Sequence, residues 1–283
     1  MKWIFGILLG ASCCLAANLA YDDASDPAYS GGWTNGANGG YGFAPWVIPY
    51  AGTNTLTFVQ SSTVNGDGDS NADGDIDTAG VAWGLASELG LFMVAYRPFT
   101  GGPLQPGQSL NVAFDTGFDD PSEETGQGIG LGNSALDEYY FVFYRASNSL
   151  TYLFSDALND GSDTGIPVSD EGGQFTFSMV GPTNYLATVT MIGGGTYSWS
   201  GSLSNAPESF LVGRTFGTNF SSSAESYRIF INRLEIVPEA HTSVLCVAGA
   251  LAAIMMKRLT RFRIVTGGVT CAGKGRIRQT AHS

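Results

Sequence analysis

An all-β domain, a sandwich or a barrel, is the fold class that the sequence predicts, and three observations lead to it. Short runs of alternating polar and apolar residues recur at roughly ten-residue to fifteen-residue intervals, with Gly, Asn, Asp and Pro between them. The clearest is Gln174–Met179, whose apolar side chains fall on one face of a strand and its polar ones on the other. No window of about twelve residues between 21 and 236 has the apolar stripe and caps of an amphipathic helix.

The alternating runs place the expected strands along the chain. They are Thr55–Gln60, Val81–Ala86, Gly90–Arg97, Ser109–Asp115, Glu138–Arg145, Leu150–Ser155, Gln174–Val180, Tyr185–Ile192, Thr196–Ser200, Ser209–Thr215 and Tyr227–Ile236. The run Glu138–Tyr144 is apolar on both faces, which favours a central strand packed in the core over one that lines an aromatic binding face. Trp33, Trp46, Trp83 and Trp199 are expected mostly in the core as well, although an exposed one could stack on a sugar ring.

The distribution of charge excludes several classes of function. All four cysteines, both histidines and all three lysines lie near the ends of the 283-residue chain, so residues 21–237 contain none of them. Five arginines against 24 acidic residues leave this stretch with a formal charge of −19. Such a domain repels phosphate backbones, so we expect no nucleic-acid partner. Without His, Cys or Lys it can form no Ser–His–Asp triad, thiolate site, His metal site or Schiff base.

Carboxylates are therefore the remaining groups for acid–base chemistry, and their spacing argues against it. Jelly-roll glucanases carry two glutamates on one strand, separated so that both face the sugar, and no such string occurs here. Asp137 and Glu138 are adjacent, so in a strand they would point to opposite faces. Glu123 and Glu124 fall in a loop-like segment. We therefore expect no catalytic residues.

An acidic run at 65–77 is the strongest local motif. Asp69, Asn71 and Asp73 alternate and are followed by Gly74 and Ile76, which resembles the first half of an EF-hand or dockerin calcium loop. Gly80 stands where the closing acidic residue of that loop is expected. The candidate Ca²⁺ ligands are Asp69, Asn71, Asp73, Asp75 and Asp77. The alternative is a solvated acidic loop between strands.

The first residues, 1–20, read as a cleaved signal peptide. Lys2 precedes an apolar run at 3–9, and small residues follow as far as Ala20. The apolar run is short for a membrane anchor. Cleavage could follow Ala17 or Ala20, and we expect it after Ala20.

Residues 237–263 predict a membrane-held sorting segment. Val237, Pro238 and Glu239 precede an apolar run at 244–256 that is just long enough to span a bilayer once its flanks are included. The cations behind the run would stay on the cytoplasmic side; they are Lys257, Arg258, Arg261 and Arg263. Residues 264–283 form a basic cytoplasmic tail of uncertain status.

This order of Val-Pro-Glu, a short apolar helix and a basic cluster resembles the PEP-CTERM sorting signal of Gram-negative bacteria, with Ala240 where the second proline usually stands. The resemblance implies processing near Pro238 and Glu239 by an exosortase, a membrane protease. It also implies association with an extracellular polysaccharide matrix.

The domain itself, residues 21–236, resembles secreted PEP-CTERM proteins that carry a concanavalin-A-like jelly roll. The resemblance rests on the segment Tyr21–Tyr29, the Gly-rich stretch to Trp46, and Ala82–Leu85. It implies a two-sheet antiparallel jelly-roll sandwich with a lectin-like shape, and a shape is not a function.

The sequence thus favours an exported, non-enzymatic protein of the cell surface or extracellular matrix, held at the membrane before processing. Glycan is the ligand class to consider, with an exosortase-type protease, the membrane and extracellular polysaccharide as expected partners. Two alternatives stay open: a carboxylate-based polysaccharide hydrolase or lyase, and a purely structural matrix protein without a ligand.

Overall fold

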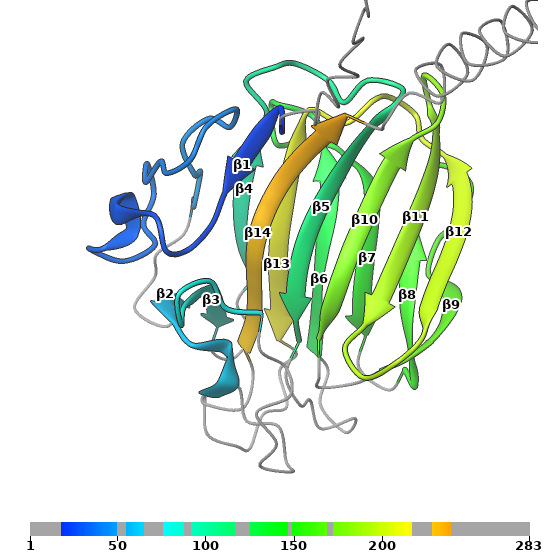
Figure 1. Ribbon diagram of the computed structural model, residues 1–283. Coiled ribbons are helices and arrows are strands. Elements are labelled where there is room, and N and C mark those ends of the chain that lie inside the picture. Colours follow the sequence, from blue (N-terminus) through cyan, green and yellow to red (C-terminus); the bar gives the residue numbers. More distant parts are fainter. Residues whose placement is uncertain are drawn as a thin grey trace, which may run out of the picture. The chain divides into compact units, whose positions relative to one another are not determined.

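The computed structural model describes residues 18–49, 55–64, 76–87, 92–116, 125–146, 149–168, 172–216 and 228–238. Within these ranges the chain forms strands and two single-turn 3₁₀ helices (Figure 1). No helix of the described part of the chain is long and apolar enough to cross a membrane. The segment 244–256, for which a membrane helix is predicted, lies outside it.

The described residues form fourteen strands. Their bounds are β1 Ala20–Asp22, β2 Thr55–Gln60, β3 Ala82–Ser87, β4 Phe92–Pro98, β5 Gln108–Asp115, β6 Thr125–Gly132, β7 Tyr139–Ala146, β8 Thr151–Ser155, β9 Ser162–Pro167, β10 Gly173–Met179, β11 Asn184–Met191, β12 Thr196–Ser202, β13 Ser209–Phe216 and β14 Arg228–Pro238. The 3₁₀ helices are η1 Pro27–Tyr29 and η2 Ser62–Val64.

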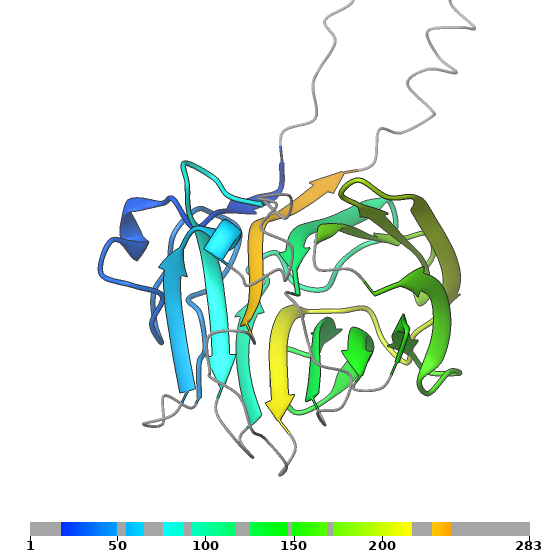
Figure 2. The same cartoon turned by 90° about the horizontal axis from the view of Figure 1, so that it is seen from below.

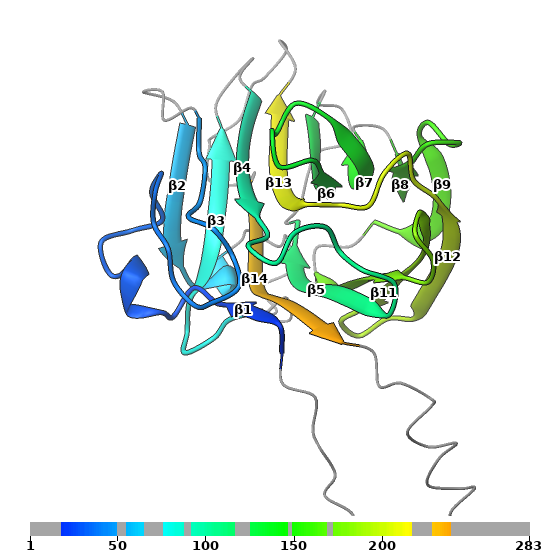
Figure 3. The same ribbon diagram turned by 90° about the horizontal axis from the view of Figure 1, so that it is seen from above.

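The strands form two antiparallel sheets, which confirms the predicted all-β sandwich. The eight-stranded sheet has the order β12-β11-β10-β5-β14-β3-β2, and β1 also pairs with β14. The six-stranded sheet has the order β4-β13-β6-β7-β8-β9. Figure 3 looks along the strands and shows β13, β6, β7 and β8 in one layer and β14, β5 and β11 in the other; Figure 2 gives the view from the opposite end.

The core lies between the sheets and is built from alternate residues of each strand. In β10, Phe175 and Phe177 are buried between the layers while Gln174 and Thr176 face outward. In β7 the same parity buries Phe141, against Phe175 and Phe177. Because the period of a strand is two, each strand contributes one apolar face to the core.

The tryptophans belong to this core, as expected. Trp33, Trp46 and Trp83 are 0–1% exposed and pack edge-on or tilted against one another, with centroid distances of 4.9–6.1 Å. Trp199 is half-buried and packs on Phe154 at 5.4 Å. Trp33, Trp46 and Trp83 therefore offer no open face to a sugar ring.

All eleven expected strands exist, and three further ones were not expected: β1, β6 and β9. In β6 every outward position is a glycine, from Gly126 to Gly132, so the strand has no polar outer half to alternate with its apolar inner half. Close approach requires these glycines. A Cβ on Gly128 would lie 2.4 Å from the Phe143 carbonyl oxygen and 2.6 Å from the Tyr144 Cβ.

The sheet extends past the expected domain bounds 21–236 at both ends. Ala20 is 1% exposed and pairs with Ile236, and the Leu19 N–H donates to the Ile236 carbonyl at 2.7 Å. At the other end β14 continues through Val237 and Pro238, which pair with β5. The first and last described segments are therefore joined side by side in one sheet.

A buried polar cluster fastens the N-terminal segment to the six-stranded sheet. The Arg97 guanidinium, from β4, donates to the Asp22 carboxylate at 2.7 Å, and both side chains are 0% exposed. The Tyr29 hydroxyl donates to the same Asp22 oxygen, and Trp46 Nε1 donates to the Tyr29 hydroxyl at 3.1 Å. Burial raises the pKa of Asp22 to about 6, against the lowering effects of the Tyr29 hydrogen bond and the Arg97 charge.

Candidate functional site

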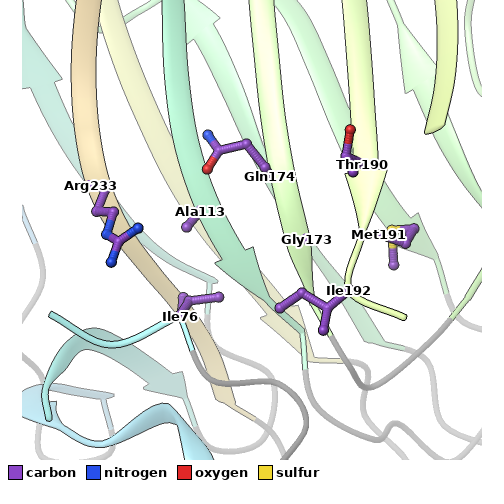
Figure 4. A pocket seen from close by; sticks show the side chains of 8 residues that line it. All are labelled: Ile76, Ala113, Gly173, Gln174, Thr190, Met191, Ile192 and Arg233. Atoms are coloured by element: carbon purple, nitrogen blue, oxygen red, sulfur yellow. The ribbon is translucent and has the colours of Figure 1, made fainter. Parts of the chain in front are cut away.

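A pocket of about 250 Å³ opens on the outer face of the eight-stranded sheet, the face turned away from the core. Four elements line it: β5, β10, β11 and β14, together with the segment before β3. The lining residues are Ile76, Ala113, Gly173, Gln174, Thr190, Met191, Ile192 and Arg233 (Figure 4). It combines one cation, one amide and one hydroxyl with apolar walls.

The strand register brings the pocket residues together. Gln174 in β10 pairs with Thr190 of β11 on one side and with Ala113 of β5 on the other. Ala113 pairs in turn with Asn232 of β14. These residues share the outer face, and the short side chain of Ala113 leaves a depression between its longer neighbours. Ile76 and Phe230 form a small apolar cluster with Ala113 that supports the floor.

A β-bulge places Arg233 at the pocket wall. Asn232 pairs with Ala113 and Glu235 with Asn111, so β14 has one more residue than β5 over this interval. Arg233 is the extra residue. Its backbone has φ 50°, in the left-handed region that non-glycine residues rarely adopt, and its side chain is exposed. Leu234 then returns to the core.

Asn232 holds the bulge in shape. Its side chain is 0% exposed and its Nδ2 donates to the carbonyl oxygens of Ile76 at 3.0 Å and Val81 at 2.9 Å. Its Oδ1 accepts from the backbone N–H groups of Ala24 and Arg233, each at 3.0 Å. One buried amide thus positions both Ile76 and Arg233, which stand on two sides of the pocket.

Beside the pocket lies an outer surface of hydroxyl and amide side chains, here called the hydroxyl face. It consists of Asn111, Gln174, Thr176, Asn184, Thr188, Thr190, Thr196, Ser198 and Ser200, on β5, β10, β11 and β12. Ser109 and Ser178 have the same strand parity but are buried. None of these residues is charged, although the domain carries −19. Cross-strand hydrogen bonds order the hydroxyls, such as Thr188 to Ser198 at 2.9 Å.

Asp156, Glu208 and Asp137 each accept hydrogen bonds from neighbouring turns and loops. Burial would raise the pKa of Asp156, but hydrogen bonds from Tyr185 and from backbone amides of its turn hold that pKa below its usual range. Hydrogen bonds from Ser134 likewise lower the pKa of Glu208. Asp137 precedes β7 rather than lying in it, and accepts from the Asn133 amide at 2.6 Å. These carboxylates are engaged locally rather than facing one another across a sheet.

Of the predicted calcium ligands, the structure describes Asp77 alone. Its Oδ1 accepts from the backbone N–H of Ser62 at 2.8 Å and from the Ser62 hydroxyl at 2.9 Å, at the start of η2. Asp69, Asn71, Asp73 and Asp75 lie outside the described residues. Within the described ranges no three His, Cys, Asp or Glu side chains come together as a metal site would require. Calcium binding stays a prediction.

The predicted processing residues are placed in part. Val237 and Pro238 end β14, where they pair with Ser109 and Gln108. Glu239 and the four membrane-stop cations, Lys257, Arg258, Arg261 and Arg263, lie outside the described residues.

Arg233, Gln174 and Thr190 were not predicted as site residues, yet the sequence carries a signal for the bulge. Ile229 and Ile231 are apolar at odd positions, whereas Leu234 and Ile236 are apolar at even ones. A strand can keep all four side chains in the core only if one extra residue is inserted between them.

No family model matches the chain, and no curated protein sequence is similar to it. Solved structures of similar fold include the globular domain of Trypanosoma cruzi calreticulin, with 10% identity, TM-score 0.43, and coverage of 78% of this chain and 94% of that one. A protein of unknown function from Shewanella oneidensis has 11% identity, TM-score 0.41, and coverage of 70% and 80%. A legume-lectin-like domain from Entamoeba histolytica has 10% identity, TM-score 0.36, and coverage of 65% and 89%. Similarity at this level carries no argument about a ligand.

Proposed function

We propose that this chain is an exported, non-enzymatic protein of the cell surface or extracellular matrix that binds glycan through the pocket and the adjoining hydroxyl face. The observation that carries the proposal is the absence of charged side chains from the outward positions of β10, β11 and β12; Glu235 lies at the β14 border of the face, where Asn111 donates to it at 3.1 Å. A domain of −19 has acidic residues in most of its loops, yet the outward positions of β10, β11 and β12 hold only Ser, Thr, Asn, Gln and the aliphatic Leu186.

This chemistry suits a polymer of sugar rings. Ordered hydroxyl and amide groups can donate to and accept from sugar hydroxyls, and a small pocket with apolar walls can take the C–H surface of one ring. The pocket lies at one end of the face, next to Thr190, so a chain of sugars bound in it would extend over the ordered hydroxyls.

Export and retention come from the chain ends. The signal peptide at 1–20 and the PEP-CTERM-like segment 237–263 would take the domain across the membrane and present it to an exosortase-type protease. In the fold, β1 and the end of β14 are paired. Both predicted processing regions therefore adjoin the same edge of the domain.

Binding can be tested with the full-length chain in detergent on a panel of neutral and acidic polysaccharides, with Gln174→Ala as the site variant. The matched control is Gln60→Ala, the same substitution on β2 of the same sheet and away from the pocket. We expect the parent chain and Gln60→Ala to bind at least one polysaccharide alike, and Gln174→Ala to bind it more weakly by about tenfold, as one lost polar contact implies.

Two outcomes would overturn the proposal. No binding to any polysaccharide would favour a structural matrix protein. Progressive shortening of a polysaccharide, followed by size-exclusion chromatography, would favour the hydrolase or lyase.

A further inference from the structure

We infer that the pocket selects a carboxylated sugar ring, such as the hexuronate unit of an acidic polysaccharide, and that Arg233 is the residue that recognises it. The inference rests on the proposed function and adds the ligand class. Arg233 is the one charged side chain of the pocket lining, so it decides the charge of the preferred ligand.

The guanidinium of Arg233 is available for a ligand. The Arg233 Nε donates a long hydrogen bond of 3.4 Å to the Thr78 hydroxyl. Within the described part of the chain the guanidinium takes part in no ion pair. By contrast, Arg97 pairs with Asp22, and Arg228 lies over the Phe58 ring at 5.3 Å. Against the raising effect of burial, the Arg233 charge helps to lower the pKa of the Asp23 carboxylate, but the two groups form no ion pair. The guanidinium can therefore still donate directly to the carboxylate of a ligand.

The backbone at Arg233 favours a binding role over a packing role. A left-handed φ of 50° disfavours any residue with a Cβ, and Gly would relieve that cost. The side chain is exposed, so it does not recover the cost through burial. Bulges that aim a side chain are common beside binding sites. Arginine at position 233 is thus unfavourable for the backbone conformation of the bulge, but its side chain is suited to reach the pocket.

The remaining lining fits a single sugar ring. The volume of about 250 Å³ is below the range of about 300–1,000 Å³ typical of pockets for drug-sized ligands. A guanidinium can donate two parallel hydrogen bonds to one carboxylate. Gln174 and Thr190 can serve the ring hydroxyls, and Ile76 and Ile192 supply apolar walls for its C–H groups (Figure 4).

The test compares glucuronate with glucose by NMR titration of the full-length chain in detergent. A salt concentration of 0.15 M limits the reach of the domain's negative field to about 8 Å. The key variant is Arg233→Gly, because Gly accepts the bulge backbone and the variant should fold as well as the parent chain. Arg228→Gln is the control, since it removes one positive charge from the same strand but outside the pocket.

We expect the parent chain and Arg228→Gln to bind glucuronate about tenfold or more tightly than glucose, and Arg233→Gly to bind the two sugars with equal affinity. Arg233→Lys should keep part of the preference, because it retains the charge but not the two-pronged geometry. Equal affinity for both sugars, unchanged in Arg233→Gly, would overturn the inference and leave glycan binding standing. Displacement of glucuronate by equal concentrations of inorganic sulfate would also overturn it, since the site would then bind any anion. Binding of neither sugar by the parent chain, together with a negative polysaccharide panel, would end both proposals.

Discussion

Replacing Asn232 with alanine should lower the free energy of unfolding of the domain more than the same replacement of an exposed asparagine. The substitution removes the hydrogen-bond partner of two buried backbone groups, the Ala24 N–H and the Ile76 carbonyl, each at 3.0 Å. The Val81 carbonyl keeps a second partner, the Thr78 N–H at 2.9 Å, so it adds little to the cost. A buried polar group left unpaired costs about 1–3 kcal/mol, so we expect Asn232→Ala to lower the free energy of unfolding by about 4 kcal/mol.

The measurement is urea denaturation followed by tryptophan fluorescence, with thermal unfolding by circular dichroism as a second probe. At about 2–4 °C per kcal/mol for a domain of this size, the melting temperature should fall by about 10 °C. Asn184→Ala is the control, because Asn184 is exposed and bonds to the Ser202 hydroxyl at 3.1 Å, and its loss should cost about 0.5 kcal/mol or less. If the two variants lose the same free energy within about 1 kcal/mol, the argument that one buried amide holds the bulge is wrong.

Three further predictions concern pH, packing and processing. The folded-state pKa of Asp22, about 6, lies above its ordinary value of 3.8, so protonation of Asp22 stabilises the fold by about 3 kcal/mol at acidic pH, and this stabilisation is lost as the pH rises through 6. In urea titrations the free energy of unfolding of the parent chain, relative to that of Asp22→Asn, should therefore increase from pH 6 to pH 4. A difference that stays constant with pH would contradict this. Gly128→Ala should cost about 2 kcal/mol or more by overpacking, whereas Gly101→Ala, which meets no atom within 4 Å, should be neutral in the same titrations. Mass spectrometry of the exported protein should find its first residue at Asn18 rather than Tyr21, since cleavage after Ala20 would remove the residues that extend β1; a mature chain that starts at Tyr21 would refute this.

The predicted calcium site can be examined by calorimetric titration of the full-length chain. Heat on adding Ca²⁺ and a melting temperature lowered by excess chelator are expected if the acidic run 65–77 binds the ion, because five like charges in a short segment repel one another without a cation. The absence of both effects would leave a solvated acidic loop.

Strands could be predicted from the sequence where polar and apolar side chains alternate, and they were missed where this alternation is absent. The strand predicted at Gln174–Val180 from its period of two is β10, Gly173–Met179, with a shift of one residue at each end. β6 was missed because its outward positions are glycines. Glycine is required there because neighbouring strands lie too close for a Cβ atom, so the positions do not show the polar residues of a water-facing strand. Ala20, the first residue of β1, was assigned to the signal peptide because it is small, and β1 is a strand only because it pairs with β14, more than two hundred residues later.

By itself the sequence determined the fold class, the anionic character of the domain, the absence of His, Cys and Lys chemistry within it, and the apolar ends, because each follows from composition or from a period that neighbouring residues carry. Only the tertiary structure decided that the uncharged outward positions of β10, β11 and β12 form one surface and which residues meet at the pocket. Ala113, Gln174, Thr190 and Arg233 come from four strands, of which only β10 and β11 are consecutive, and their meeting depends on strand register and on a single inserted residue in β14. Register is a property of pairs of strands, held by buried contacts such as those of Asn232, so no local pattern could specify it.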